Sequence, residues 1–205
     1  MARVSIGRVR MAMIAAGLAA VTAPASAPAQ FTQSYTFLKA VRDRDGNKME
    51  DTLHKGGPNM IDTRDADTGE SAVQIVTRRR DATWLQYMLQ KGANPNARDN
   101  AGNTALIYAA QVGFEDGVRL LIMAHAQVDL TNRSGETALI KAVQSGDLQC
   151  VRLLLAAGAN PKKADTIAGM TARDYAARDP RLAVILKEID SAKPVAAERP
   201  VAGPK

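Results

Sequence analysis

Residues 99–131 read DNAGNTALIYAAQVGFEDGVRLLIMAHAQVDLT, and residues 132–164, which follow directly, read NRSGETALIKAVQSGDLQCVRLLLAAGANPKKA. Both segments contain G-x-T-A-L-I near the start, a glycine in the middle and V-R-L-L before the end. A period of about 33 residues with this pattern is typical of a repeat array, in which each unit is a turn followed by two antiparallel helices. Each unit buries its apolar side chains against its neighbours, so the array needs no central core.

The residue types within one unit support this prediction. Gly102 permits a tight turn before the first helix, and Thr104 can cap the early backbone N–H groups of that helix. Aromatic residues make up only 4% of the chain, which suits thin helical layers better than a bulky globular core. Gly92 and Gly158 follow the second helix, where a left-handed residue is needed. His125 occupies that position in the third unit, so the pattern predicts a strained closing turn there.

When the period is followed in both directions from the quoted stretch, the chain contains five units in total. The first unit is degenerate, and its polar second helix is predicted to end at Gly56-Gly57-Pro58 and to form a cap in contact with water. The fifth unit runs one residue late, because Gly169 lies 34 positions after Gly135. The predicted units span residues 31–65, 66–98, 99–131, 132–164 and 165–190, and residues 191–205 are predicted to form a flexible tail.

These motifs closely resemble the ankyrin repeat family, whose pattern is roughly D-x-x-G-x-T-P-L-H-x-A-A-x-x-G, a V-x-x-L-L helix and G-A-x-x-N. The resemblance covers residues 31–190 and implies an all-α, ankyrin-repeat solenoid of about five helix-turn-helix units with short β-hairpin-like finger loops. The chain departs from the pattern in two ways. Alanine replaces the usual proline at Ala105, Ala138 and Ala172, and isoleucine replaces the usual histidine, whose hydrogen bonds tie adjacent turns, at Ile107 and Ile140.

The first 29 residues have the composition of a cleavable signal peptide. Arg3, Arg8 and Arg10 precede an uncharged run at residues 11–21. Ala27-Pro28-Ala29 offers a small-residue cleavage site that leaves Gln30 at the N-terminus, and Ala23-Pro24-Ala25 is an alternative site. The apolar run is too short to cross a bilayer, which takes about 20 residues. Removal of residues 1–29 takes away three arginines and no acidic residue, so the net charge falls from +6 to +3. We therefore expect export to a bacterial periplasm, no stable membrane span and no nucleic-acid partner.

Catalytic chemistry has little support in the sequence. The two histidines, His54 and His125, have no acid or nucleophile at a matching spacing, and the single cysteine, Cys150, falls on a helix face expected to be buried. One cysteine and two distant histidines give no chelating motif, and no phosphate-binding G-x-x-x-x-G-K-[ST] run is present. The sequence predicts no catalytic residue, no metal site and no cofactor.

The resemblance instead implies a protein-binding surface. Partners of ankyrin proteins usually contact the finger tips and the exposed, concave face of the first helices. Transferred position by position, this surface comprises Arg42, Arg44, Arg78, Arg79, Arg98, Asn100, Asn103, Gln111, Arg133, Glu136 and Gln144.

An arginine cluster stands out within this surface. Residues 78–80 end the first helix of the second unit, and Arg42 and Arg44 end the corresponding helix of the first, so five guanidinium groups are expected on one rim. Cations at helix C-termini are favoured by the helix dipole and can be simple solvated surface. Alternatively, arginine suits bidentate contacts with carboxylates, and the cluster is a docking patch for an acidic protein surface.

Together these features predict a non-enzymatic, monomeric adaptor that binds another protein in the periplasm. An exported enzyme or an envelope complex is the partner class suggested by the family resemblance. Two alternatives remain: a secreted effector that binds host proteins, and an enzyme with an uncharted site.

Overall fold

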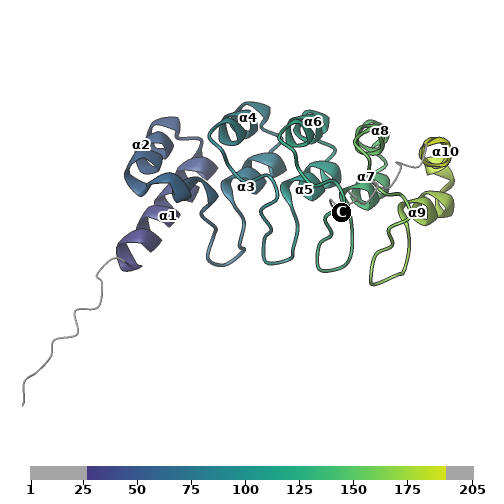
Figure 1. Ribbon diagram of the computed structural model, residues 1–205, viewed down its shortest axis with the longest axis horizontal. Coiled ribbons are helices and arrows are strands. Elements are labelled where there is room, and N and C mark those ends of the chain that lie inside the picture. Colours follow the sequence, from purple (N-terminus) through teal and green to yellow (C-terminus); the bar gives the residue numbers. More distant parts are fainter. Residues whose placement is uncertain (1–26, 193–205) are drawn as a thin grey trace, which may run out of the picture.

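Five helix pairs stack side by side into an elongated solenoid in the computed structural model, which describes residues 27–192 (Figure 1). The first helices of the units form one row and the second helices a parallel row, while four loops project from the first row away from the second (Figure 1). The described residues contain ten α-helices and no named strand, and isolated antiparallel bridges close two of the loops, at Arg64–Ser71 and Ala164–Thr171. The predicted all-α solenoid of five units is confirmed.

The helices are short and regular apart from the first. The first helices of the five units are α1 (Ala27–Asp43), α3 (Ala72–Arg78), α5 (Ala105–Gln111), α7 (Ala138–Gln144) and α9 (Ala172–Arg178). The second helices are α2 (Gly46–Gly56), α4 (Ala82–Gln90), α6 (Glu115–Met123), α8 (Leu148–Ala156) and α10 (Ala183–Ser191). Two single-turn 3-10 helices, η1 (Pro58–Asp62) and η2 (Pro180–Leu182), complete the terminal units. The predicted leader and tail lie outside the described residues, except for 27–29 and 191–192.

Side-chain caps explain where the helices begin. The hydroxyls of Thr104 and Thr137 accept from the N–H groups of the residues three positions on, as predicted. Each of three second helices begins at an aspartate, Asp45, Asp81 or Asp147, whose carboxylate accepts in the same way. The third unit has Phe114 at this position and no side-chain cap.

The core is a continuous layer between the two rows of helices. Small residues of the first helices, such as Ala109 and Ala142, are fully buried and let neighbouring helices approach closely. Leu121 and Leu154 are fully buried between the rows, whereas Leu120 and Leu153 are half-buried at the edge of the layer. Each unit buries its apolar side chains against the next one, as expected for a repeat array.

Neighbouring fingers are tied together by backbone hydrogen bonds. We use "finger" for residues 65–70, 99–103, 132–136 and 165–170. One N–H at or next to each later finger donates to a carbonyl of the finger before it, in the pairs Asn100 to Thr68 (2.9 Å), Arg133 to Ala101 (3.0 Å) and Thr166 to Ser134 (2.9 Å). These bonds connect adjacent turns although Ile107 and Ile140 carry no donor.

One unit keeps a polar side chain at the histidine position. Gln74 aligns with Ile107 and Ile140 and is completely buried. Its Nε2 donates to the backbone carbonyl of Asn103 in the next finger at 2.7 Å, and its Oε1 accepts from the backbone N–H of Ser71 at 2.8 Å. A glutamine therefore makes the inter-repeat bond that the family pattern assigns to histidine.

A second ladder joins the loops that follow the second helices. The backbone N–H groups of Asn94, Gln127 and Asn160 each donate to a side-chain oxygen of the preceding unit, at 2.8, 2.8 and 2.9 Å. The acceptors are Asp62, Asn96 and Asp129. The second, third and fourth units are thus joined to one another by both ladders, while one ladder joins the first unit to the second and the other joins the fourth to the fifth.

Among the described residues, three other than glycine adopt left-handed backbone conformations. His125 has a φ of 59°, at the position where Gly92 and Gly158 have 88° and 91°, so the strained closing turn predicted for the third unit is confirmed. Arg44 and Arg80, with φ of 60° and 57°, are two further cases that the sequence analysis did not identify. They stand between the paired helices, where the next two units have glycine.

We expect His125→Gly to raise the free energy of unfolding by about 1 kcal/mol, because glycine adopts this conformation without the Cβ penalty. Thermal and urea unfolding followed by circular dichroism would measure the gain. Gly158→His is the matched control, since it places the same penalty in the next unit and should destabilise the fold by a similar amount. An unchanged or lower stability for His125→Gly contradicts the prediction.

Candidate partner-binding surface

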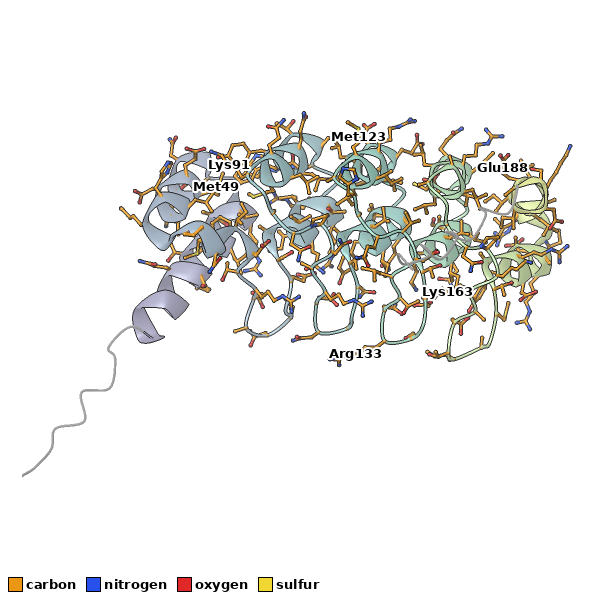
Figure 2. All side chains as sticks on the ribbon, in the orientation of Figure 1. Met49, Lys91, Met123, Arg133, Lys163 and Glu188 are labelled. Carbon is orange, nitrogen blue, oxygen red and sulfur yellow. The ribbon has the colours of Figure 1, made fainter. Side chains whose placement is uncertain are left out.

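The fingers and the first helices together form one continuous face of the solenoid, which we call the finger face. All four fingers lie on the same side of the array, and Lys91, Met123 and Glu188 lie on the opposite, second-helix side (Figure 2). Each finger begins with an aspartate or asparagine whose Oδ1 accepts two backbone N–H groups of its own turn: Asp65, Asp99, Asn132 and Asp165. This side-chain bonding holds the turns in a fixed shape.

The outer fingers are one residue longer than the inner ones. The N–H of the opening residue donates to the carbonyl five positions on in the first and last fingers, at Asp65 and Asp165, but four positions on at Asp99 and Asn132. The late register predicted for the fifth unit is therefore an insertion in its finger. The first finger carries the same insertion, which the spacing of Gly69 and Gly102 concealed.

Three of the predicted partner-binding side chains are free on this face. Arg98, Gln111 and Arg133 are exposed, and their side chains make no hydrogen bond or ion pair with the described residues. Arg133 lies at a finger tip (Figure 2). Asn100 is exposed as well, but its Nδ2 donates to the Asp67 carbonyl of the preceding finger at 2.9 Å.

Three other predicted side chains belong to a polar network that spans adjacent units. Asn132 Nδ2 donates to Asn103 Oδ1 at 3.1 Å and to Glu136 Oε2 at 2.9 Å. Glu136 also pairs with Lys141 at 2.7 Å and accepts from Gln144 at 3.4 Å. Asn103, Glu136 and Gln144 thus reinforce the scaffold and keep only part of their bonding capacity for a partner.

The network continues towards the N-terminus through an aromatic residue that the sequence analysis missed. Tyr108 donates its hydroxyl to Asp99, and the Arg78 guanidinium lies over its ring at 5.3 Å from the centroid. Burial, followed by the hydrogen bond to Asp99, raises the pKa of Tyr108 to about 12. The phenol therefore remains protonated and continues to donate at physiological pH.

Three of the five clustered arginines meet at one hollow. Arg42, Arg78 and Arg79 line this hollow of about 320 Å³ together with Glu70 and Ile75. Arg44 pairs with Asp81 at 3.2 Å, and the same carboxylate lies 3.8 Å from Arg79. Arg44 and Arg80, which have left-handed backbone after the ends of the first helices, do not line the hollow.

Arg79 is a structural residue rather than a free surface cation. Its Nη1 donates to the carbonyls of Val41 and Arg42 at 2.6 and 2.8 Å, at the C-terminal end of α1. Two units further on, Ser145 Oγ occupies the equivalent position and donates to the Ala110 carbonyl at 3.2 Å. Both side chains satisfy carbonyls that a helix end leaves unpaired.

Comparison with known proteins agrees with this architecture. The family model for ankyrin repeats in three copies matches residues 37–132 and again 118–190. The chain belongs to the ankyrin repeat family. Ankyrin repeats are protein-protein interaction modules.

The ankyrin matches among curated proteins are short compared with those proteins. An ankyrin repeat protein of Acanthamoeba polyphaga mimivirus is 43% identical over 49 residues, which is 24% of this chain and 12% of that protein. A calmodulin-binding transcription activator of Oryza sativa subsp. japonica is 35% identical over 114 residues, or 53% of this chain and 12% of that protein. This chain thus spans only about an eighth of the length of either protein.

Reactive groups are scarce in the described ankyrin domain. Cys150 is completely buried, and burial together with Asp147 raises the pKa of its thiol to about 12. The thiol is therefore protonated at neutral pH and is a poor nucleophile. Within residues 27–192, no group of three or more His, Cys, Asp or Glu is placed to hold a metal ion, and none of the helices there has the length and apolarity to cross a membrane.

A second hollow, of about 330 Å³, lies between α2, η1 and α4. Leu53, Pro58 and Ile61 give it apolar walls. Its polar groups are satisfied by one another, since Tyr87 donates to Glu50 and Lys91 Nζ lies 3.8 Å from Glu50 and 5.2 Å from the Tyr87 ring. This hollow faces away from the fingers and was not anticipated from the sequence.

The pKa of Asp65 generates a prediction about acid stability. Hydrogen bonds from the Thr68 backbone N–H and from Arg42 lower the pKa of Asp65 from 3.8 to about 2. A carboxyl group with a lower pKa in the folded than in the unfolded chain stabilises the fold above its unfolded pKa. That contribution is lost as pH falls through the folded value. After allowance for solvent screening, it amounts to about 1 to 2 kcal/mol.

Asp65→Asn should therefore be less stable than the parent chain at about pH 6 and equally stable at about pH 2, as measured by urea denaturation. An asparagine Oδ1 can also accept two backbone N–H groups of a finger, as Asn132 does from Ser134 and Glu136. Asp67→Asn in the same finger is the control, because Asp67 has no ion pair with the described residues. Parallel pH profiles for the parent and Asp65→Asn would rule out this role.

Proposed function

We propose that this chain is a non-enzymatic adaptor that binds a protein partner through its finger face and acts in the bacterial periplasm. The observation that carries the proposal is that some polar side chains of that face join adjacent units while others are free to bind a partner. Asn103, Glu136, Gln144 and Asn100 hold adjacent units in register, while Arg98, Gln111 and Arg133 project without partners among the described residues. A pre-shaped surface with free polar side chains binds without having to order itself first.

The residue types on the finger face favour a protein partner. The free side chains are arginine and glutamine, which form directional hydrogen bonds, and arginine is enriched at protein interfaces and their hot spots. The chain would carry a net charge of only +3 after removal of residues 1–29, a value that gives little drive towards nucleic acid. An exported enzyme or an envelope complex is the partner class that we propose.

The periplasmic setting rests on the leader-like composition of residues 1–29. Fractionation of cells expressing the full chain, followed by mass spectrometry of the N-terminus, tests it. We expect a product in the periplasmic fraction that begins at Gln30. Recovery in the culture supernatant supports the secreted effector in place of the periplasmic adaptor, and an uncleaved product in the cytosol contradicts export altogether.

Partner binding can be tested by affinity capture from periplasmic extract with two matched variants. The first replaces Arg98, Gln111 and Arg133 with alanine on the finger face. The second replaces Arg119, Gln149 and Lys187 with alanine; these residues are exposed on the second helices. Both variants should melt within a few degrees of the parent, because exposed positions change stability little.

We expect the finger-face variant to capture at least about 90% less partner than the parent chain. A tenfold loss of affinity corresponds to about 1.4 kcal/mol of binding free energy. The second-helix variant should capture as much as the parent. Equal capture by all three proteins, or loss only in the second-helix variant, would place binding elsewhere and refute the proposed use of the finger face.

A further inference from the structure

We infer that the hollow lined by Arg42, Arg78 and Arg79 is a carboxylate-binding pocket, which receives one aspartate or glutamate side chain of an acidic segment of the partner. The inference rests on the proposed function and specifies the chemistry of the partner. It also narrows the arginine-rich surface from five residues to three that meet at one point.

The pocket brings together groups from two repeats. Arg42 comes from the end of α1, while Arg78 and Arg79 come from the end of α3 and the residue after it. The hollow measures about 320 Å³ and is bounded by Glu70 and the largely buried Ile75. This volume accommodates a short acidic side chain.

Unused hydrogen-bond donors are present at this pocket. Nη1 of Arg79 is held by two backbone carbonyls, but Nε and Nη2 are buried and have no hydrogen-bond partner. These are the two buried side-chain nitrogen or oxygen atoms of the described residues that lack a hydrogen bond. Nη2 lies 3.8 Å from Oδ2 of Asp81, an ion pair that is too long for a hydrogen bond. Buried polar groups are almost always paired, so an acceptor in the hollow would complete an arrangement that the chain itself leaves unfinished.

The second side of the pocket comes from arginines that already bind carboxylates. Arg42 pairs with Asp65 at 2.5 Å, and Arg78 pairs with Glu70 at 2.5 Å. Their side chains remain 38% and 54% exposed, respectively, and a guanidinium has five N–H donors. Each therefore keeps donors for a second carboxylate.

The charge balance favours a single carboxylate over a phosphate group. Three arginines and Glu70 give the lining a net charge of +2, and Asp65 next to Arg42 reduces the local sum to +1. Asp81 next to Arg79 leaves this sum unchanged, because its charge is balanced by its ion pair with Arg44. A monoanion is matched by this charge, whereas a phosphate dianion would lie against two carboxylates. Ile75 adds an apolar wall for the methylene groups of the entering side chain.

Arg79 provides a direct test, because its Hε–Nε group gives an NMR signal of its own. The full ¹⁵N-labelled chain would be titrated with the peptide acetyl-Gly-Ser-Glu-Ser-Gly-amide, with the same peptide carrying glutamine, and with inorganic phosphate. We expect the Arg79 signal to shift saturably with the glutamate peptide, with a Kd of about 1 to 10 mM, as befits a single charged contact. The glutamine peptide should leave the signal in place.

Variants then separate pocket binding from general attraction to a basic protein. Arg78→Gln should weaken glutamate-peptide binding about tenfold, because it removes a charge-assisted donor. Arg119→Gln removes the same charge from an exposed position on α6, on the second-helix side, and should leave the Kd unchanged. Should Arg78→Gln prove unstable, the parent titration alone decides the question, since it requires no substitution.

The outcomes are distinct. No Arg79 shift with the glutamate peptide, or an equal shift with the glutamine peptide, overturns the pocket. A stronger response to phosphate than to the glutamate peptide overturns the choice of carboxylate. If the peptide titration fails but the finger-face variant alone loses the captured partner, only the pocket is refuted. If all three proteins of the capture experiment retain the partner equally, the proposed binding by the finger face is refuted as well.

Discussion

The hydrogen bond from one finger to the carbonyl of the finger before it is the interaction on which this architecture depends. It recurs between every pair of neighbouring fingers, at 2.9 to 3.0 Å. A second ladder at the opposite loops supports it. With both in place, the buried alanines of the first helices can pack closely and the layer between the rows can form. In an array of units stacked in one dimension, order along the axis comes only from such contacts between neighbouring units.

This constraint also decides which side chains are available for recognition. Gln74, Asn100, Asn103 and Glu136 lie on or beside the finger face, yet much of their bonding capacity connects one unit to the next. Arg79 likewise serves the end of α1. Recognition is left to side chains that project past these bonds and to the arginines that retain unused donors. The hydrogen-bonded side chains therefore hold the surface in a fixed shape, and the few free side chains determine what it can bind.

The sequence predicted the fold well because the repeat pattern reports backbone requirements directly. Glycine at the turns, threonine at the caps and alanine in the first helices each have one physical role, so their spacing fixed the units. Side-chain partners across units were harder to predict. Nothing local shows that Arg79 reaches the end of α1, or that Gln74 replaces a histidine, because both contacts join residues 29 to 38 positions apart. The arginine cluster could be predicted only in part for a related reason. Adjacency in sequence does not show that Arg44 and Arg80, whose own backbone is left-handed, line no part of the hollow.

The ladders between units also give the molecule a chemical polarity along its axis. In every finger pair the later unit donates and the earlier one accepts, and the opposite ladder runs in the same sense. The two ends of the array are consequently not equivalent templates. A further finger placed beyond the fifth unit would find its acceptor at the carbonyl of Ala168, which corresponds to Thr68, Ala101 and Ser134 of the earlier fingers. A unit added on that side therefore has to supply only a backbone donor, whereas a unit added before the first finger has to supply an acceptor.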